Sequence, residues 1–178
     1  MPVYTKKGDK GTTGLFASTK QTWTIPKNSP RIRAIGGIDE INSFLGLCAA
    51  FIENQSVLEI VFEIQRDLFT IGSILAGAPL TFSASKVKKL EGKIDSMESV
   101  LPKLSNFILP GGSRAGALLH TARVVTRRAE RELSHLAGRE KVNAQIVKYV
   151  NRLSDFLFTL ARKVNFDLGT PEKIWKSR

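Results

Sequence analysis

Residues 107–136 read FILPGGSRAGALLHTARVVTRRAERELSHL, and this stretch decides the fold of the chain. The breaker cluster at 110–112 is followed by Ser113, a residue type that commonly caps a helix, so we expect a helix to begin there. Apolar residues then recur every three or four positions, which predicts one helix with one buried face. That face contains Leu118, Ala122, Val125, Ala129, Leu133 and Leu136.

A polar stripe runs beside that apolar face. It consists of Arg123, Arg127, Glu130, Arg131 and Ser134. Guanidinium groups stacked on one helical face repel one another, so something must offset the repulsion. Water and surface acids are one interpretation, as for an ordinary solvated basic helix. A bound polyphosphate is the other, because a guanidinium group can bind phosphate oxygens in bidentate fashion.

Length and composition bound the remaining possibilities. A chain of 178 residues with 42% hydrophobic residues predicts one soluble globular domain with a sizeable core. The net charge of +11 indicates anionic partners: nucleic acid, a membrane surface or phosphorylated small molecules. Cys48 lies in an apolar run, which predicts a buried thiol in a reducing cytoplasm. With one cysteine and two histidines, a structural zinc site is not favoured.

Apolar periodicity predicts four further helices, at residues 38–53, 56–76, 85–101 and 142–168. Gly36-Gly37 marks a boundary before the first of them, and Pro102 ends the third. Short connections favour an all-α fold, a five-helix up-and-down bundle. We expect a single domain over residues 1–178, with an irregular N-terminal segment at 1–35, the bundle at 36–168 and a tail at 169–178. Residues 12–17 could be extended, but no sheet is needed.

The N-terminal segment has features of an anion-binding loop. Glycines at 8, 11 and 14 alternate with lysines and threonines, so backbone N–H groups are accessible to an anion. The segment matches neither the Walker A pattern nor the dinucleotide fingerprint, and a flexible basic arm is the alternative. Lys27, in the polar stretch 18–30, has the features of a surface lysine. No apolar run is long enough to span a bilayer, so we expect no membrane partner.

Three other positions allow two interpretations each. Asp39 either complements a helix dipole in a first turn or pairs with an arginine from elsewhere. The run 151–155, NRLSD, is poor helix chemistry within the last predicted helix. It indicates either a functional site or a hydrogen-bond network between helices. Phe107 either packs in the core or, next to the breaker cluster, is presented to solvent.

Four blocks of sequence occur in an order that is typical of one enzyme family. They are YTKKGDKGTTG (4–14), GIDEIN (37–42), FILPGG (107–112) with the arginines of 123–131, and NRLSD (151–155). Together they resemble the PduO-type ATP:cob(I)alamin adenosyltransferases over nearly the whole chain. The stretch 18–29 and the tail after residue 168 look less similar to that family.

The resemblance implies a fold, an assembly and a reaction. It implies homotrimeric five-helix bundles with an active site at each subunit interface. There the 5′-deoxyadenosyl group of ATP passes to cob(I)alamin, triphosphate leaves, and adenosylcobalamin forms, with Mg²⁺ accompanying the nucleotide. It also implies a cytoplasmic enzyme whose further partners are a cobalamin reductase and a cobalamin-dependent acceptor enzyme.

The resemblance also assigns residues to roles. Arg127 would contact phosphate, Arg123 and Asp39 would form an intersubunit salt bridge, and Phe107 would displace the lower axial ligand of cobalt. Phe107, Phe158 and Asp155 would lie near the cobalamin. The ATP-binding residues would be Thr5, Lys6, Gly8, Asp9, Lys10, Gly11, Thr12, Thr13, Lys27, Arg127, Arg128, Glu130, Arg131 and Asn151.

These roles agree with the chemistry. Reduced cobalt is the nucleophile, so no side-chain nucleophile is required. The leaving triphosphate carries the negative charge, which cations and amides can stabilise. Two other classes stay open. A basic module could bind nucleic acid, although no known DNA- or RNA-binding motif is present. A structural or regulatory trimer could bind ATP without chemistry.

Overall fold

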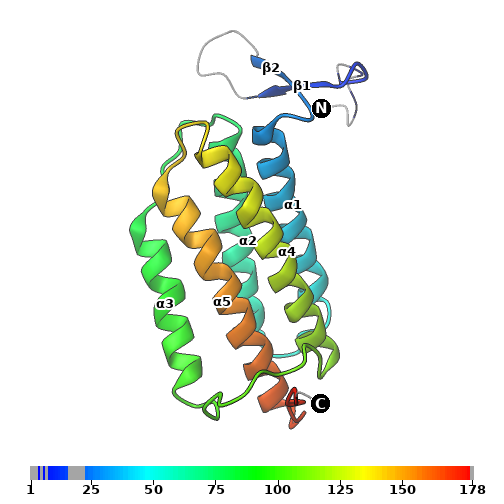
Figure 1. Cartoon of the computed structure of the whole chain (residues 1–178), viewed down its shortest axis with the longest axis vertical. Coiled ribbons are helices and arrows are strands. Elements are labelled where there is room, and N and C mark those ends of the chain that lie inside the picture. The colour runs from blue at the N-terminus through cyan, green and yellow to red at the C-terminus, as the bar shows by residue number, and fades with distance from the viewer. Residues whose placement is uncertain (1–3, 5, 7, 16–22, 177–178) are drawn as a thin grey trace.

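The computed structural model describes residues 4, 6, 8–15 and 23–176, which form five long helices and one short hairpin (Figure 1). Successive helices run in alternating directions, which confirms the predicted all-α, up-and-down bundle. The elements are β1 (Thr12–Leu15), β2 (Trp23–Pro26), α1 (Pro30–Ala49), α2 (Gln55–Leu75), α3 (Ala84–Glu98), α4 (Arg114–Ala137) and α5 (Ala144–Asp167).

The central helix α4 begins where the sequence predicted. Ser113 is its N-cap, and its hydroxyl accepts a hydrogen bond from the Gly116 N–H at 3.0 Å. A serine or asparagine also caps each of the other four helices: Ser29, Asn54, Ser83 and Asn143. These side chains satisfy N–H groups that a helix leaves unpaired at its start.

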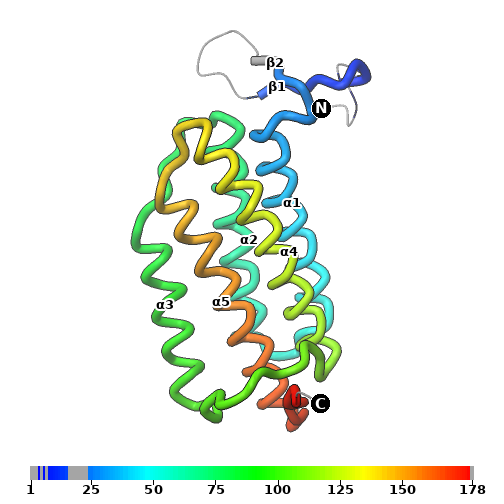
Figure 2. The backbone as a smooth tube through the Cα atoms, viewed as in Figure 1, coloured from blue at the N-terminus to red at the C-terminus, as the bar shows by residue number. Residues whose placement is uncertain are grey.

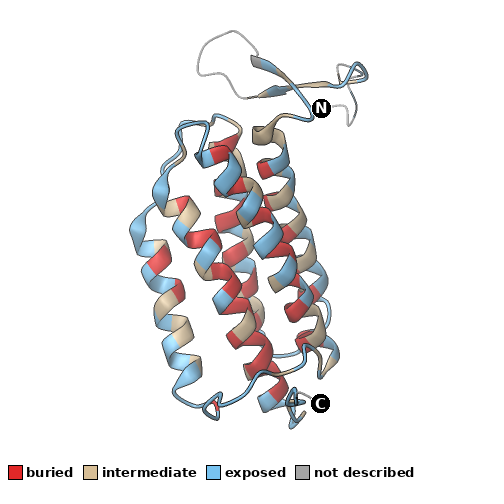
Figure 3. Ribbon diagram, viewed as in Figure 1, coloured by how far each residue is buried: buried red, intermediate tan, exposed pale blue. Residues whose placement is uncertain are grey.

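The hydrophobic core lies along the bundle axis, on the inward face of each helix (Figure 3). Helix α4 packs on both α1 and α5, α5 packs also on α3, and α1 packs on α2. The predicted apolar stripe of α4 is buried except at its first position. Leu119 is fully buried there, while Leu118 is only half-buried.

Helix α1 begins at Pro30, eight residues before the predicted start. Ser29 caps it and Pro30 occupies its first turn, where a missing N–H costs nothing. Gly36 and Gly37 lie inside the helix, so the predicted boundary between residues 35 and 36 was wrong. A Cβ on Gly37 would lie 2.9 Å from the Cβ of Ala129. Gly37 therefore serves close packing between α1 and α4, not a chain break.

The N-terminal segment contains a small sheet that the sequence interpretation did not require. β1 and β2 pair antiparallel, with Thr12 opposite Pro26 and Leu15 opposite Trp23. The hairpin lies beyond the bundle at the end where α1 starts, and the C-terminal tail lies at the opposite end (Figure 2). The remaining helix boundaries differ from prediction by a few residues.

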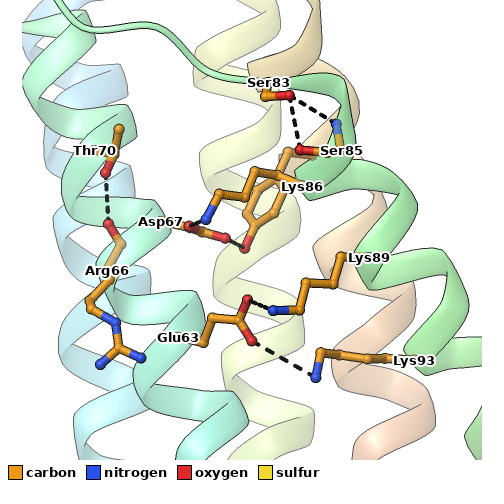
Figure 4. A network of polar contacts seen from close by, with 10 residues as sticks. Glu63, Arg66, Asp67, Thr70, Ser83, Ser85, Lys86, Lys89 and Lys93 are labelled. Carbon is orange, nitrogen blue, oxygen red and sulfur yellow. Dashed lines mark hydrogen bonds and ion pairs between the residues drawn. The ribbon is translucent and has the colours of Figure 1, made fainter.

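A charged network joins α3 to α2 (Figure 4). Buried Asp67 accepts a hydrogen bond from the Tyr149 hydroxyl at 3.0 Å and pairs with Lys86 at 2.7 Å. Burial, together with Asp67, raises the pKa of the Tyr149 phenol, which keeps its proton. Glu63 pairs with Lys89 at 2.5 Å and with Lys93 at 3.8 Å. Part of the excess positive charge on α3 is therefore balanced by acids of α2.

Candidate functional site

A cleft of about 450 Å³ opens between α3, α4 and α5, and we call it the arginine cleft. From α4 it contains Arg123 and Arg127, and from α5 it contains Arg152, Asp155 and Phe158. The acids Glu91, Asp95 and Glu98 of α3 line its other side. The structure therefore brings together four predicted site residues: Arg123, Arg127, Asp155 and Phe158.

Arg123 is the least satisfied cation of the arginine cleft. Its Nε atom is buried and has no hydrogen-bond partner, and its Cζ atom lies 5.9 Å from the centroid of the Phe158 ring. Burial lowers the pKa of this guanidinium, and the neighbouring Arg127 lowers it further. Arg127 is exposed, and its side chain makes no ion pair with the residues that the structure describes. An anionic ligand would relieve both features.

His120 lies on α4 about one turn before Arg123. It is buried, its Nδ1 atom lacks a partner, and its ring centroid is 5.9 Å from that of Phe158. Burial and the charge of Arg123 lower the pKa of the imidazole, against an opposing effect of Glu172. Neutral His120 therefore adds no charge beneath Arg123. The sequence interpretation had not singled it out.

The other predicted nucleotide residues of α4 and α5 make contacts within the chain. Arg128 pairs with Glu40 of α1. The Arg131 guanidinium donates to the Arg127 carbonyl at 3.0 Å. Asn151 donates to Glu130 at 2.6 Å, across the α4–α5 interface. None of these four predicted residues, Arg128, Glu130, Arg131 and Asn151, is among the residues that line the arginine cleft.

The NRLSD run contains the interhelical hydrogen bonds that one interpretation predicted. Arg152 donates to Glu91 of α3 at 3.2 Å and to Asp155 at 2.8 Å. Burial alone would lower the pKa of Arg152, but the two carboxylates raise it. The Ser154 hydroxyl donates to the Asn151 carbonyl at 2.9 Å, so its hydrogen bond is made within α5. The same run also places Asp155 in the cleft, and a functional role for the run stays a prediction.

The N-terminal loop folds back on Lys27. The Lys27 N–H donates to the Gly11 carbonyl at 2.9 Å, and Gly11 has a φ of 77°, which favours glycine. The Lys27 ammonium lies 3.1 Å from where a Cβ on Gly8 would be. Lys6, Asp9 and Lys10 are exposed. Predicted residue Thr5 lies outside the described residues.

A groove of about 530 Å³, which we call the hairpin groove, runs between α1 and α2, and Thr13 of β1 and Lys27 also line it. Its lining residues on α1 include Asp39 and Asn42. The Oδ1 atom of Asn42 is buried and has no partner. Asp39 thus lies on the α1–α2 face, whereas Arg123 lies on the face formed by α3, α4 and α5. Within one chain, the residues that the structure describes include no Asp39–Arg123 ion pair.

Phe107 is presented to solvent, with an exposed fraction of 80%, so core packing is excluded for it in this chain. It lines a third depression, the aromatic hollow of about 580 Å³, with Leu104 and Trp175. The Trp175 N–H donates to the Phe107 carbonyl at 2.8 Å, and the Leu109 N–H donates to the Lys173 carbonyl at 2.8 Å. The C-terminal tail therefore pairs with the segment that carries Phe107.

Asn165 of α5 holds the glycines that follow Phe107, and the sequence interpretation missed it. Its Oδ1 accepts from the Ser113 N–H at 2.9 Å and its Nδ2 donates to the Gly111 carbonyl at 2.9 Å. A Cβ on Gly112, whose φ is 105°, would lie 2.3 Å from this side chain. Gly116 leaves room for it in the same way. A buried asparagine on the apolar face of α5 was the available signal.

The described residues contain neither a metal-binding cluster nor a membrane-spanning helix. No group of three or more His, Cys, Asp or Glu side chains there is placed to hold a metal ion. No helix among them is long and apolar enough to cross a membrane. Cys48 is buried and free, as predicted, and burial raises the pKa of its thiol to about 11.

Comparison with known proteins identifies the family. The family model for cobalamin adenosyltransferase matches residues 3–164. The corrinoid adenosyltransferase of Bacillus subtilis is 41% identical over 95% of this chain and 89% of its own length. The cobalamin adenosyltransferase of Cupriavidus metallidurans is 41% identical over 98% of this chain and 94% of its own.

A solved structure shares the fold over the full chain. A variant of the PduO-type ATP:corrinoid adenosyltransferase from Lactobacillus reuteri, complexed with cobalamin and ATP, superposes with a TM-score of 0.93. It is 35% identical and covers 99% of this chain and 100% of its own. Sequence and structure agree, and the chain belongs to the cobalamin adenosyltransferase family.

Proposed function

We propose that this protein transfers the 5′-deoxyadenosyl group of ATP to cob(I)alamin and releases triphosphate. The observation that carries the proposal is the arginine cleft, where Arg123 lies against the Phe158 ring and Arg127 lines the same cleft. Among the described residues, neither arginine pairs with a carboxylate. Such a site fits a ligand that is both anionic and flat. The Lactobacillus reuteri relative was solved with ATP, which carries an anionic triphosphate, and with cobalamin, which carries a flat corrin ring.

We further propose that the site is completed by a second copy of the chain in a homotrimer. Thr13, Lys27 and Asp39 share the hairpin groove, while Arg123 and Arg127 share the arginine cleft on another face. Contact between these two faces of neighbouring subunits would pair Asp39 with Arg123. It would also bring the N-terminal loop over Arg127. Each subunit would then supply half of a nucleotide site.

The proposed reaction breaks one bond and forms one. Reduced cobalt of the substrate attacks the 5′ carbon of ATP, a Co–C bond forms, and the C5′–O bond breaks with its electron pair on triphosphate. Lys27, Arg127 and the loop N–H groups would stabilise that charge. Mg²⁺ would enter with the nucleotide, since it usually binds through substrate phosphates, waters and one or two carboxylates. Asp9 is the only acid among the first 35 residues and could supply one.

Phe107 has the proposed role of an apolar wedge at the lower face of the corrin. An exposed aromatic side chain there would exclude water and the axial base, which makes cobalt easier to reduce. The electron would come from a cobalamin reductase, and the product would pass to a cobalamin-dependent enzyme. We place the protein in the cytoplasm, a reducing compartment that suits the lone thiol of Cys48.

The test combines protein, ATP and chemically reduced cobalamin and follows the corrin absorption spectrum. We expect conversion to adenosylcobalamin together with stoichiometric triphosphate. ATP binding without conversion would indicate a structural or regulatory trimer. Binding to DNA that weakens steeply with salt and that ATP does not compete away would indicate a nucleic-acid module.

A further inference from the structure

A buried ion pair near the end of α5 links the two chain segments that flank the aromatic hollow. Arg162 is 5% exposed. Its Nε donates to one Glu172 oxygen at 2.6 Å and its Nη2 donates to the other at 3.2 Å. The same Nη2 donates to the Pro102 carbonyl at 2.9 Å. We call Arg162, Glu172 and the Pro102 carbonyl the Arg162 cluster.

Along both chain segments, the Arg162 cluster comes a few residues before the point where the segments pair with each other. Beyond Pro102 the chain reaches Phe107, and beyond Glu172 it reaches Trp175. There the segments pair through an antiparallel bridge between Ile108 and Ile174, flanked by the two backbone hydrogen bonds described above. Residues 107–109 and 173–175 form what we call the tail ladder.

The tail ladder has little to hold it in place by itself. Phe107, Leu109, Ile174 and Trp175 are all exposed, so the ladder buries little apolar surface. A pair of strands of this size is marginal in water without support from other elements. The Arg162 cluster supplies that support, because a charged fork with three hydrogen bonds fixes both entering segments to α5.

We propose that Arg162 is a positioning residue for Phe107. Through Glu172 and Pro102 it fixes the tail ladder, and the ladder fixes where the Phe107 ring is presented. Arg162 does not touch the substrate and acts only through these contacts. The inference rests on the proposed role of Phe107 in displacing the lower ligand of cobalt.

Glu172→Gln is the variant that tests this link with the least damage to the fold. It keeps the size of the side chain and removes the charge from the more exposed partner of the pair. Arg162→Ala would instead leave a carboxylate without its cation and open a cavity in α5. The matched control is Asp167→Asn, which removes the Lys163–Asp167 pair from the same end of α5 without touching the tail ladder.

Fluorescence reports on the tail ladder without any turnover. The sequence has two tryptophans, so a Trp23→Phe background leaves Trp175 as the only one. In that background, Glu172→Gln should lower the anisotropy of Trp175 and increase its quenching by acrylamide, and Asp167→Asn should change neither. Unchanged Trp175 fluorescence in Glu172→Gln would overturn the proposal.

Activity is measured by two routes, one starting from cob(II)alamin with a reductant and one from chemically prepared cob(I)alamin. Glu172→Gln should slow the first route about tenfold, the effect of a small misplacement of a critical group, and spare the second and the KM for ATP. In a Phe107→Ala background, Glu172→Gln should add no further loss. Equal losses by both routes, or losses that multiply with Phe107→Ala, would contradict a positioning role.

The two measurements separate this inference from the proposed function. If Phe107→Ala spares the cob(II)alamin route, the proposed role of Phe107 fails, whereas the fluorescence of Trp175 still decides whether the Arg162 cluster holds the tail ladder. If Phe107→Ala slows that route and Glu172→Gln leaves both readouts unchanged, Arg162 has no part in presenting Phe107.

Discussion

At the scale of single residues, three residues with proposed roles, Arg123, Arg127 and Phe107, have side chains that are not fully partnered within the described part of the chain. The buried Nε of Arg123 and the unpaired guanidinium of Arg127 lie in one cleft, and the Phe107 ring lies in solvent at the end of the bundle. A buried polar atom without a partner costs stability in an isolated chain, so the Arg123 Nε indicates a ligand or a second subunit.

Replacing Arg127 by alanine should reduce turnover at saturating ATP by about 10²–10³-fold, as expected for the loss of one charge-stabilising donor. Helical content and assembly should stay as in the wild type, because the Arg127 side chain makes no ion pair with described residues of its own chain. Steady-state kinetics and sedimentation would measure both. Arg139→Ala, an exposed arginine just beyond α4, is the control, and an unchanged rate for Arg127→Ala would remove its assigned role.

Replacing Phe107 by alanine should separate reduction from alkyl transfer. The rate from cob(II)alamin should fall by at least about tenfold, while the rate from cob(I)alamin stays near the wild-type value, because cob(I)alamin needs no removal of a lower ligand. Because Phe107 is exposed and contributes little to the core, the variant should unfold at nearly the same temperature as the wild type. Equal losses in the two assays would argue against the axial-ligand role.

His120 makes stability depend on pH in the acid range. Its folded pKa lies below the ordinary value of 6.5, so the unfolded chain binds a proton more readily. The neutral imidazole therefore stabilises the fold above pH 6.5, and that contribution is lost as the pH falls through the folded pKa. Urea unfolding between pH 7.5 and about 5 should show a smaller decline for His120→Gln than for the wild type.

At the scale of elements, the positions of most helices could be predicted from the sequence, but the contacts between helices could not. Apolar periodicity predicted α2, α4 and α5 to within a few residues, and the Ser113 cap also predicted where α4 begins, because both signals depend only on the local sequence. The start of α1 was wrong because Gly36-Gly37 has the composition of a breaker, and only the approach of Ala129 explains why glycine is needed inside the helix. The structural roles of Asn165 and Arg162 were missed because their partners are distant along the chain. Asn165 accepts from Ser113, 52 positions away, and Arg162 pairs with Glu172, ten positions away and beyond the end of the helix.

Gly37→Ala tests the packing of α1 on α4. A new methyl group 2.9 Å from the Ala129 Cβ should destabilise the protein by about 1–3 kcal/mol, as overpacking does. Ala129→Gly in the same chain should restore part of the loss. Gly92→Ala on α3, where a Cβ meets nothing within 4 Å, should instead be neutral or stabilising. Urea unfolding of the wild type, the three single variants Gly37→Ala, Ala129→Gly and Gly92→Ala, and the double variant measures these differences. Additive losses in the double variant would contradict direct contact.

At the scale of the whole molecule, the predicted site residues of the single chain lie on two different faces. The hairpin groove carries Lys27 and Asp39, and the arginine cleft carries Arg123 and Arg127. The sequence motifs predicted both sets of residues as site residues, but their separation over the surface follows from the bundle topology and could not be predicted from local sequence. The proposed trimer would bring the two sets together.

Mixing two inactive variants tests this shared site. Lys27→Ala and Arg127→Ala damage opposite halves, so a randomly mixed trimer should have about a quarter of its interfaces fully intact. After exchange of subunits, activity should rise to about a quarter of the wild-type rate. A mixture that stays as inactive as its components would place both residues in a site within one subunit.

The opposite placement of the two chain ends has a practical consequence for tagging and immobilisation. A fusion at the start of the chain would extend from the loop that Lys27 contacts, and a fusion at the end would begin two residues after Lys176, beside the aromatic hollow. Either label would crowd one half of the chemistry.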